Sequence, residues 1–220
     1  MPNATRRVGR PPLSEEVLRE RRAAILQVTL GLVAEVGTDN VKLRDVAARA
    51  GVSVGTLQHY FVTRDQMLRD AFSQHAHAVV STLQEAARSP VDPWERIRLL
   101  LQTITASPEN LRQRCVLWIE FAAASLRDPE LRRLMEDAYE GWREPLLSAV
   151  KEGIASGLFK PVLPPETAVS NLLALIDGLE MALALEIPGI SNEQVFQQLH
   201  DVAAVLLGVT APADGGGPEH

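Results

Sequence analysis

Apolar residues recur at helical spacing along nearly the whole chain, and no segment shows the strict apolar–polar alternation that is typical of a half-buried strand. Glycines and prolines interrupt this pattern at intervals, as they do at helix ends. The uninterrupted blocks predict helices at about residues 14–36, 42–49, 53–60, 63–88, 93–106, 108–126, 129–156, 165–187 and 191–208. We therefore expect an all-α protein in which a long helix connects three N-terminal helices to five further helices.

The charges are distributed unevenly along the chain. The net charge is −6, but residues 1–64 hold ten basic and six acidic residues, whereas the remainder holds 12 basic and 22 acidic residues. A basic N-terminal module on an acidic body indicates a polyanionic partner at one end of the molecule. The alternative is an ordinary fluctuation of surface charge, and the charges alone do not decide between the two.

The segment from Val41 to Leu68 reads VKLRDVAARAGVSVGTLQHYFVTRDQML and carries the most information about function. Two short helices are expected to meet at a tight turn, where Gly51 supplies a backbone conformation that other residues resist. Ala47 allows the two helices to approach closely. A small shared core is expected from Val46, Val52, Leu57 and Phe61. This is the plan of a helix-turn-helix, whose second helix enters the DNA major groove.

The exposed face of the second helix has the chemistry of a base reader. It offers short polar groups without negative charge, namely Ser53, Thr56, Gln58, His59 and Tyr60. Gln reads adenine through two hydrogen bonds, Thr contacts a polar edge or a thymine methyl, and Gly55 leaves room for the backbone to approach DNA. The basic residues expected on phosphates are Lys42, Arg44 and Arg64, and Arg10 of the N-terminal arm is expected in an adjacent minor groove. The alternative is a plain helical hairpin with solvated polar groups.

This segment resembles the TetR family of bacterial regulators. The resemblance rests on RDVAARAGVSVGTLQHYF followed by TRDQML, and it covers about residues 15–68. It implies base-facing positions for Val54, Gly55, Thr56 and Gln58, and phosphate-facing positions for His59, Tyr60 and Arg64. Lys42 departs from the family pattern, which usually has a Ser or Thr that caps the helix, so Asp45 lacks its capping-box partner. The implied function is sequence-specific binding of double-stranded DNA as a transcriptional repressor; a transcriptional activator and a non-specific architectural protein are the alternatives.

The rest of the chain resembles the BetI-type branch of the family, in the segments LWIEFAAASLRDPELRRLMEDAYEGWREPL and NLLALIDGL. This resemblance implies a regulatory domain that binds a small molecule and dimerises through its last two helices. The residues agree, because the helices at 165–187 and 191–208 are apolar on more than one face and would be covered by a second copy. A homodimer would read a palindromic operator whose half-sites lie about 34–36 Å apart, or a multiple of that distance. Burial of these helices inside a monomer is the alternative.

Candidate effector contacts are the aromatic residues of the middle helices and the polar residues among apolar neighbours. They are His75, Trp118, Glu120, Phe121, Tyr139, Trp142 and Asp177. Binding pockets are mostly apolar with a few polar anchors, and an acid in such a wall favours a cationic or amine-bearing effector over an aromatic face. As alternatives, the aromatic residues form an ordinary core, Glu120 is a surface group that is solvated or paired with Arg, and Asp177 belongs to the dimer interface.

The sequence argues against an enzyme. It contains no catalytic triad in a motif context, no phosphate-binding glycine loop and no HExxH, so we expect no catalytic residue, no metal and no cofactor. His75 and His77 are two residues apart and therefore point to different faces of a helix, which makes them a poor metal pair. Cys115 lies in an apolar helix, where a buried inert thiol is favoured over the alternative of a redox sensor.

The chain is expected to divide into four parts: a flexible basic arm at 1–13, a helix-turn-helix DNA-binding domain at 14–62, a helical regulatory and dimerisation domain at 63–210, and a disordered tail at 211–220. The N-terminus is basic, but no apolar segment of a signal peptide follows it. The longest apolar stretch carries Asn171, Asp177 and Glu180, which argues against a membrane span. We therefore expect a cytoplasmic protein.

Overall fold

The computed structural model describes residues 14–105 and 108–209, and within these ranges it contains helices and no strand. The elements in chain order are α1 (Glu15–Val36), the 3-10 helix η1 (Thr38–Asn40), α2 (Leu43–Arg49), α3 (Val54–Tyr60), α4 (Arg64–Ala87), α5 (Pro93–Thr105), α6 (Pro108–Ser125), α7 (Pro129–Ala155), α8 (Pro165–Ala184) and α9 (Asn192–Leu207). The all-α prediction is confirmed, and each predicted helix is present. The short helix η1 was not predicted. The N-terminal arm and the C-terminal tail lie outside the described residues.

Local sequence sets the ends of the N-terminal helices. The Ser14 hydroxyl accepts a hydrogen bond from the Val17 amide at the start of α1, and Gly37 ends that helix with φ +78°. Gly51 forms the turn between α2 and α3 with φ +66°, a backbone conformation that favours glycine. Lys42 precedes α2 without a side-chain capping bond, as its departure from the family pattern indicates.

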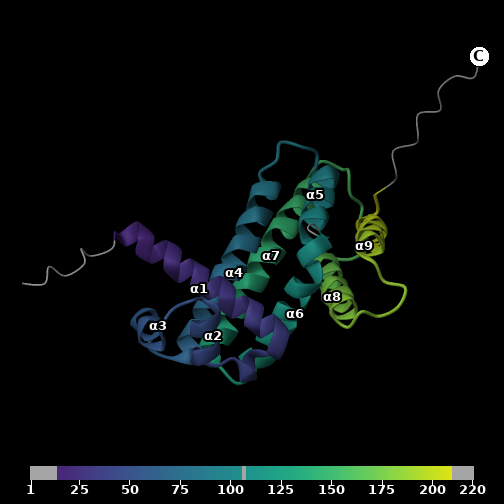
Figure 1. Ribbon diagram of the computed structural model, residues 1–220. Coiled ribbons are helices and arrows are strands. Elements are labelled where there is room, and N and C mark those ends of the chain that lie inside the picture. The colour runs from purple at the N-terminus through teal and green to yellow at the C-terminus, as the bar shows by residue number, and fades with distance from the viewer. Residues whose placement is uncertain (1–13, 106–107, 210–220) are drawn as a thin grey trace, which may run out of the picture.

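The N-terminal helices α1, α2 and α3 gather at one end of the molecule, and α4 leads from them into the larger helical body (Figure 1). In this body α4 packs against α5 and α7, while α8 packs against α6, α7 and α9. The approach of α4 to α7 requires a glycine, because a Cβ atom on Gly141 would lie 2.7 Å from the Val80 Cγ2 atom. The long helix α4 therefore packs against both the N-terminal helices and the body, and it connects the two.

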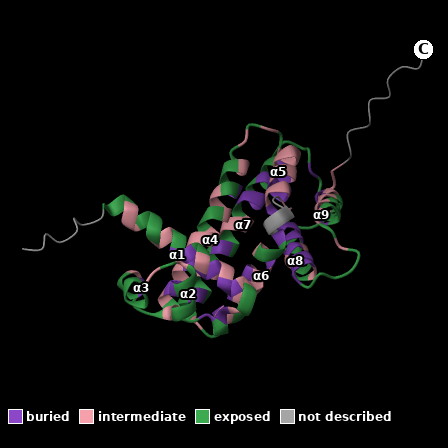
Figure 2. Cartoon of the chain, viewed as in Figure 1, coloured by how far each residue is buried: buried purple, intermediate pink, exposed green. Residues whose placement is uncertain are grey.

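Buried residues lie along the helices throughout the molecule (Figure 2). They form two apolar clusters. The larger one lies within the body and is built mainly from α5, α7, α8 and α9. The second lies around α1–α4, but it is completed by Leu117 and Phe121 of α6 and by Leu131 and Ala138 of α7. The core of the N-terminal helices is thus continuous with the body and is not closed by those helices alone.

Helix α8 is long and apolar enough, by length and composition, to cross a membrane. One such helix is weak evidence, because a core helix of a soluble protein has the same composition. In this structure α8 packs against three other helices, and it buries Leu172, Ile176 and the charged residue Glu180. A carboxyl group in that position would cost free energy in a lipid bilayer, whereas inside a protein it can make polar interactions.

Candidate DNA-binding face and effector cavity

Helix α3 presents an uncharged polar face to solvent. Leu57 is fully buried and fixes the helix on the N-terminal core. The exposed residues are Ser53, Val54, Gly55, Thr56, Gln58 and His59, and Tyr60 is half-buried. The Ser53 hydroxyl caps the helix by accepting from the Thr56 amide at 3.0 Å, and it lies 2.8 Å from the Thr56 hydroxyl oxygen. Gln58 thus remains available for two hydrogen bonds to a base edge.

The predicted basic contacts occupy different environments. Lys42 and Arg44 are exposed at the start of α2, and Arg44 lies 3.4 Å from the Asp45 carboxylate. Arg64 was expected to face phosphate, but its guanidinium is turned inward. Its Nε donates to the Val41 carbonyl at 2.7 Å, and another of its nitrogens donates to the Thr38 carbonyl. Arg64 therefore ties α4 to the backbone of η1 and of Val41, which follows it. Arg10 lies outside the described residues.

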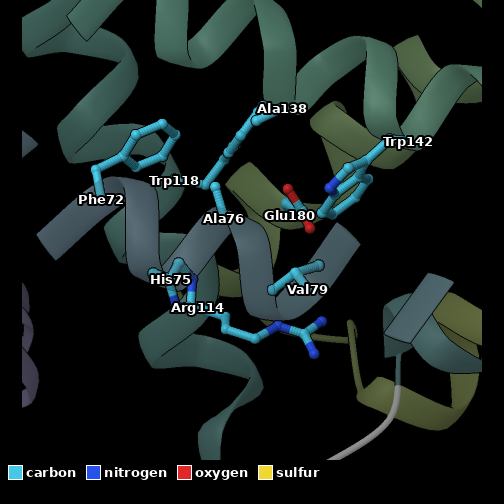
Figure 3. Close-up of a pocket in the computed structure, with 9 residues that line it drawn as sticks. All are labelled: Phe72, His75, Ala76, Val79, Arg114, Trp118, Ala138, Trp142 and Glu180. Atoms are coloured by element: carbon cyan, nitrogen blue, oxygen red, sulfur yellow. The ribbon is translucent and has the colours of Figure 1, made fainter. Parts of the chain in front are cut away.

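A small cavity of about 20 Å³ lies in the body between α4, α6, α7 and α8 (Figure 3). Its lining residues are Phe72, His75, Ala76, Val79, Arg114, Trp118, Ala138, Trp142 and Glu180. The rings of Trp118 and Trp142 are stacked, with centroids 5.7 Å apart and planes 20° from parallel. The cavity therefore combines an aromatic wall with a few charged or polar groups, which is the composition of a small-molecule site.

Glu180 is the unusual group of this cavity. It is only 6% exposed, and its Oε2 atom has no hydrogen-bond partner. Burial raises the pKa of Glu180 from 4.5 to about 7; the positive charge of Arg114 opposes this rise and the negative charge of Asp177 adds to it. A buried carboxyl oxygen without a partner is costly. The group is therefore poised to gain stabilisation from a bound cation or hydrogen-bond donor.

Another part of the cavity wall carries His75 and Arg114, which lie close together in Figure 3. Burial and the positive charge of Arg114 together lower the pKa of His75 to about 4, so the imidazole is neutral at pH 7. Arg114 also donates a hydrogen bond to the Ile104 carbonyl. This part of the cavity wall thus offers hydrogen-bond donors, and Glu180 offers an acceptor.

Three of the predicted effector contacts line the cavity, namely His75, Trp118 and Trp142. The other four are not among its lining residues. Phe121 is buried against Phe72, with ring centroids 4.9 Å apart, and Tyr139 is partly exposed on α7. Burial raises the pKa of Asp177, and an interaction with the Trp118 side chain opposes this rise. Glu120 points to the N-terminal helices and accepts from the Thr38 amide.

Sequence reasoning missed Glu180 as a cavity residue, although a signal for it exists. Glu180 follows Leu173 by seven residues and Ile176 by four, so it shares the buried face of α8. Arg114 and Phe72 were also missed.

Cys115 does not behave as a redox sensor in this environment. The thiol is buried, and burial raises its pKa to about 12, so it stays protonated at neutral pH. Over residues 14–105 and 108–209, no cluster of three or more His, Cys, Asp or Glu side chains is arranged to hold a metal ion.

An exposed helix-turn-helix face, joined by a long helix to a body with an aromatic cavity, defines the class of DNA-binding regulators that respond to small molecules. Comparison with known families gives the particular family. Residues 25–71 match the model of the bacterial regulatory proteins of the tetR family, and residues 93–208 match that of the C-terminal domain of BetI-type transcriptional repressors. The chain belongs to the TetR family and carries a BetI-type C-terminal domain.

Individual relatives agree with this assignment. The chain is 29% identical over 195 residues to the transcriptional regulator BetI of Burkholderia lata. This match covers 85% of this chain and 94% of BetI. It is 26% identical over 181 residues to the regulator PksA of Bacillus subtilis, covering 80% and 84% of the two chains. A transcriptional regulator from Saccharomonospora viridis, solved in complex with choline, superposes with a TM-score of 0.78 at 26% identity and covers 83% of this chain and 95% of that one.

The functional class predicted from the sequence is thereby confirmed. The chain is a DNA-binding transcriptional regulator of the repressor type with a ligand-binding C-terminal domain, and its family is not enzymatic. FadR of Bacillus subtilis, solved in complex with stearoyl-CoA, shares only the fold, with a TM-score of 0.70 at 18% identity over 85% of this chain and 98% of that one.

Proposed function

We propose that this protein is a cytoplasmic homodimer that binds a palindromic operator through one α3 helix from each copy, and that a small cationic effector releases it. In this proposal, residues 14–62 bind DNA, and residues 63–210 provide regulation and dimerisation. Effector binding can lower operator affinity only if the effector favours the conformation that fits DNA poorly.

The DNA contacts follow from the exposed face of α3. Val54, Gly55, Thr56 and Gln58 are assigned to base edges, because they are exposed and carry no negative charge that phosphates would repel. The proposed phosphate contacts are Lys42, Arg44, His59 and Tyr60. Ser53 acts mainly as the helix cap, and Arg64 supports the backbone behind the reading helix.

The proposed dimer interface lies on α8 and α9. Leu185 is 64% exposed, Val205 is 81% exposed, and both are large apolar residues on or beside these helices. Met181 and Val202 add to the same exposed set. Exposed apolar side chains are unfavourable in water, and their burial against the same helices of a second copy would form a two-fold helical interface.

The observation that carries the effector proposal is the buried carboxyl group of Glu180, whose Oε2 atom has no hydrogen-bond partner, beside two stacked tryptophans. A cation bound there would pair with the carboxylate and lie against an aromatic face, which are two favourable interactions in a desolvated site. In another part of the cavity wall, His75 and Arg114 would bind a hydroxyl or another acceptor of the same molecule. The choline bound by the Saccharomonospora viridis regulator has both features, so choline is the first compound to test.

A two-stage experiment tests this function. Selection of bound duplexes from a random DNA pool by the purified protein should give a palindrome. Choline chloride should then weaken the complex with that palindrome, whereas its neutral carbon isostere, 3,3-dimethylbutan-1-ol, should not. A monomer that binds no duplex would contradict the dimeric reader. A palindrome whose complex is insensitive to choline and to other small quaternary or primary amines would contradict the cationic effector alone. In vitro transcription from that operator separates repression from activation.

A further inference from the structure

Glu120 of α6 makes a contact that effector binding and base reading leave unexplained. Its Oε2 atom accepts a hydrogen bond from the Thr38 amide at 2.9 Å and a weaker one from the Thr38 hydroxyl at 3.4 Å. Thr38 is buried and begins η1, between α1 and α2. A hydrogen bond between a carboxylate and a backbone amide is charge-assisted and directional. This bond joins the body directly to the backbone of the N-terminal helices.

The residue before Thr38 is shaped for this contact. Gly37 has φ +78°, and a Cβ atom at this position would lie 3.1 Å from the Glu120 Oε2 atom. Any larger residue would therefore be strained in its backbone and would press on the carboxylate. The Thr38 carbonyl in turn accepts from Arg64 of α4. Residue 38 is thus held through its amide by α6 and through its carbonyl by α4.

Two other polar contacts near this end of the molecule are less constraining. Arg127 lies 3.6 Å from Asp39, and both side chains are mostly exposed. Arg69 pairs with Asp128 at 2.9 Å, but this contact joins α4 to the start of α7 and does not reach residues 14–62. Exposed ion pairs between flexible side chains hold a geometry weakly. The Glu120 contact is part-buried and ends on the backbone, so it restricts orientation more.

We propose that Glu120 is a positioning residue for DNA recognition. By holding the Thr38 amide, it fixes the orientation of the helix-turn-helix on the body and so sets the half-site spacing that the dimer accepts. This inference rests on the dimeric reader proposed above. Trp118, which lines the cavity, lies two residues before Glu120 on α6. An effector that moves Trp118 would therefore also displace Glu120 from Thr38. Loss of this bond is then one step by which the effector releases DNA.

Operator spacing gives the test. Duplexes would carry the selected half-sites at the selected spacing and at spacings one base pair shorter and longer. The discrimination ratio is the affinity for the selected spacing divided by the mean affinity for the other two. For Glu120→Ala we expect this ratio to fall about threefold to tenfold relative to the unmodified protein, the range that the net loss of one ordinary hydrogen bond supports. Glu120→Gln retains an oxygen that accepts from the Thr38 amide, so it should keep most of the ratio.

The controls separate positioning from stability. Loss of folded protein lowers affinity for all three spacings equally and leaves the ratio unchanged. Glu136→Ala, an exposed change on α7, should behave as the unmodified protein. If circular dichroism shows that Glu120→Ala does not fold, Glu120→Asp replaces it, because the shorter side chain withdraws the oxygen from Thr38 but keeps the charge. A palindrome with an unchanged ratio for the folded variant would overturn this inference alone. Failure of the unmodified protein to select a palindrome would overturn the dimeric reader, and the inference with it.

Discussion

Replacing Glu180 by glutamine should stabilise the folded protein while removing its response to a cation. The carboxyl group is almost fully buried, and one of its oxygens has no partner. Without an effector, an ionised Glu180 is therefore a cost to folding, whereas a glutamine of nearly the same shape carries no charge into the core. Natural proteins often retain such a cost where binding requires the group.

The magnitude follows from the pKa of Glu180, which is about 7 in the folded protein and ordinarily 4.5. The raised pKa means that the folded state binds a proton more tightly than the unfolded chain. This favourable contribution is complete below pH 4.5 and is lost between pH 4.5 and pH 7. At about 1.4 kcal/mol for each factor of ten in proton affinity, the loss is about 3 kcal/mol at pH 8 and less than about 1 kcal/mol at pH 5. Glu180→Gln avoids it.

Urea unfolding at pH 5 and pH 8, at one fixed protomer concentration, measures the effect. The free energy of unfolding of Glu180→Gln relative to the unmodified protein should rise by about 2–3 kcal/mol between the two pH values. Glu136→Gln makes the same chemical change at an exposed position of α7 and should show no such rise. A Glu180→Gln difference that is the same at both pH values would refute the reasoning, because it would mean that the buried carboxyl titrates normally.

Four further outcomes are expected. Choline affinity, measured by calorimetry, should fall up to about tenfold per pH unit below pH 7, because the cavity carboxyl must first lose its proton; a flat profile would contradict this. Gln58→Ala should cost about 1–3 kcal/mol of operator binding and relax preference at one base pair, whereas an equal loss on every sequence would place Gln58 on phosphate. Val205→Asp should halve the molecular mass measured in solution, whereas Val162→Asp, at a loop position that is 97% exposed, should leave it unchanged. A Val205→Asp protein that remains dimeric would show that the interface lies on another surface. Gly153→Ala should destabilise the fold by about 1–3 kcal/mol, because its Cβ would lie 2.1 Å from the Phe159 ring, and unchanged urea unfolding would rule out that close packing.

Much of the fold was predictable because its signals are local. Ser14 and Gly37 define the ends of α1 by capping and by a left-handed backbone, and Gly51 defines the helix-turn-helix in the same way. These effects depend on a few neighbouring residues. The functional class was accessible for the same reason, since α3 and its flanking turns form one continuous segment.

The polar side chains of the body were harder to assign, because their roles depend on contacts that are distant in sequence. Trp118 and Glu120 both appeared to be effector contacts, but residues two apart on a helix point to different faces, and only Trp118 lines the cavity. Glu180 was hidden in a helix that is apolar on several sides. The role of Arg64 depends on carbonyls of η1 and its flank, an element that carries no strong sequence signal.

The shared core around Phe121 has a consequence for building chimeric sensors from this protein. Phe121 packs on Phe72 of α4, and with Leu117, Leu131 and Ala138 it supplies the underside of the N-terminal helices. A fragment that ends after α4 would expose this apolar surface to water and should aggregate or remain partly unfolded. A chimera that joins the DNA-binding helices to a foreign sensor domain would therefore have to include the end of α6 and the beginning of α7. The unit to be transferred thus consists of two separated pieces of the chain.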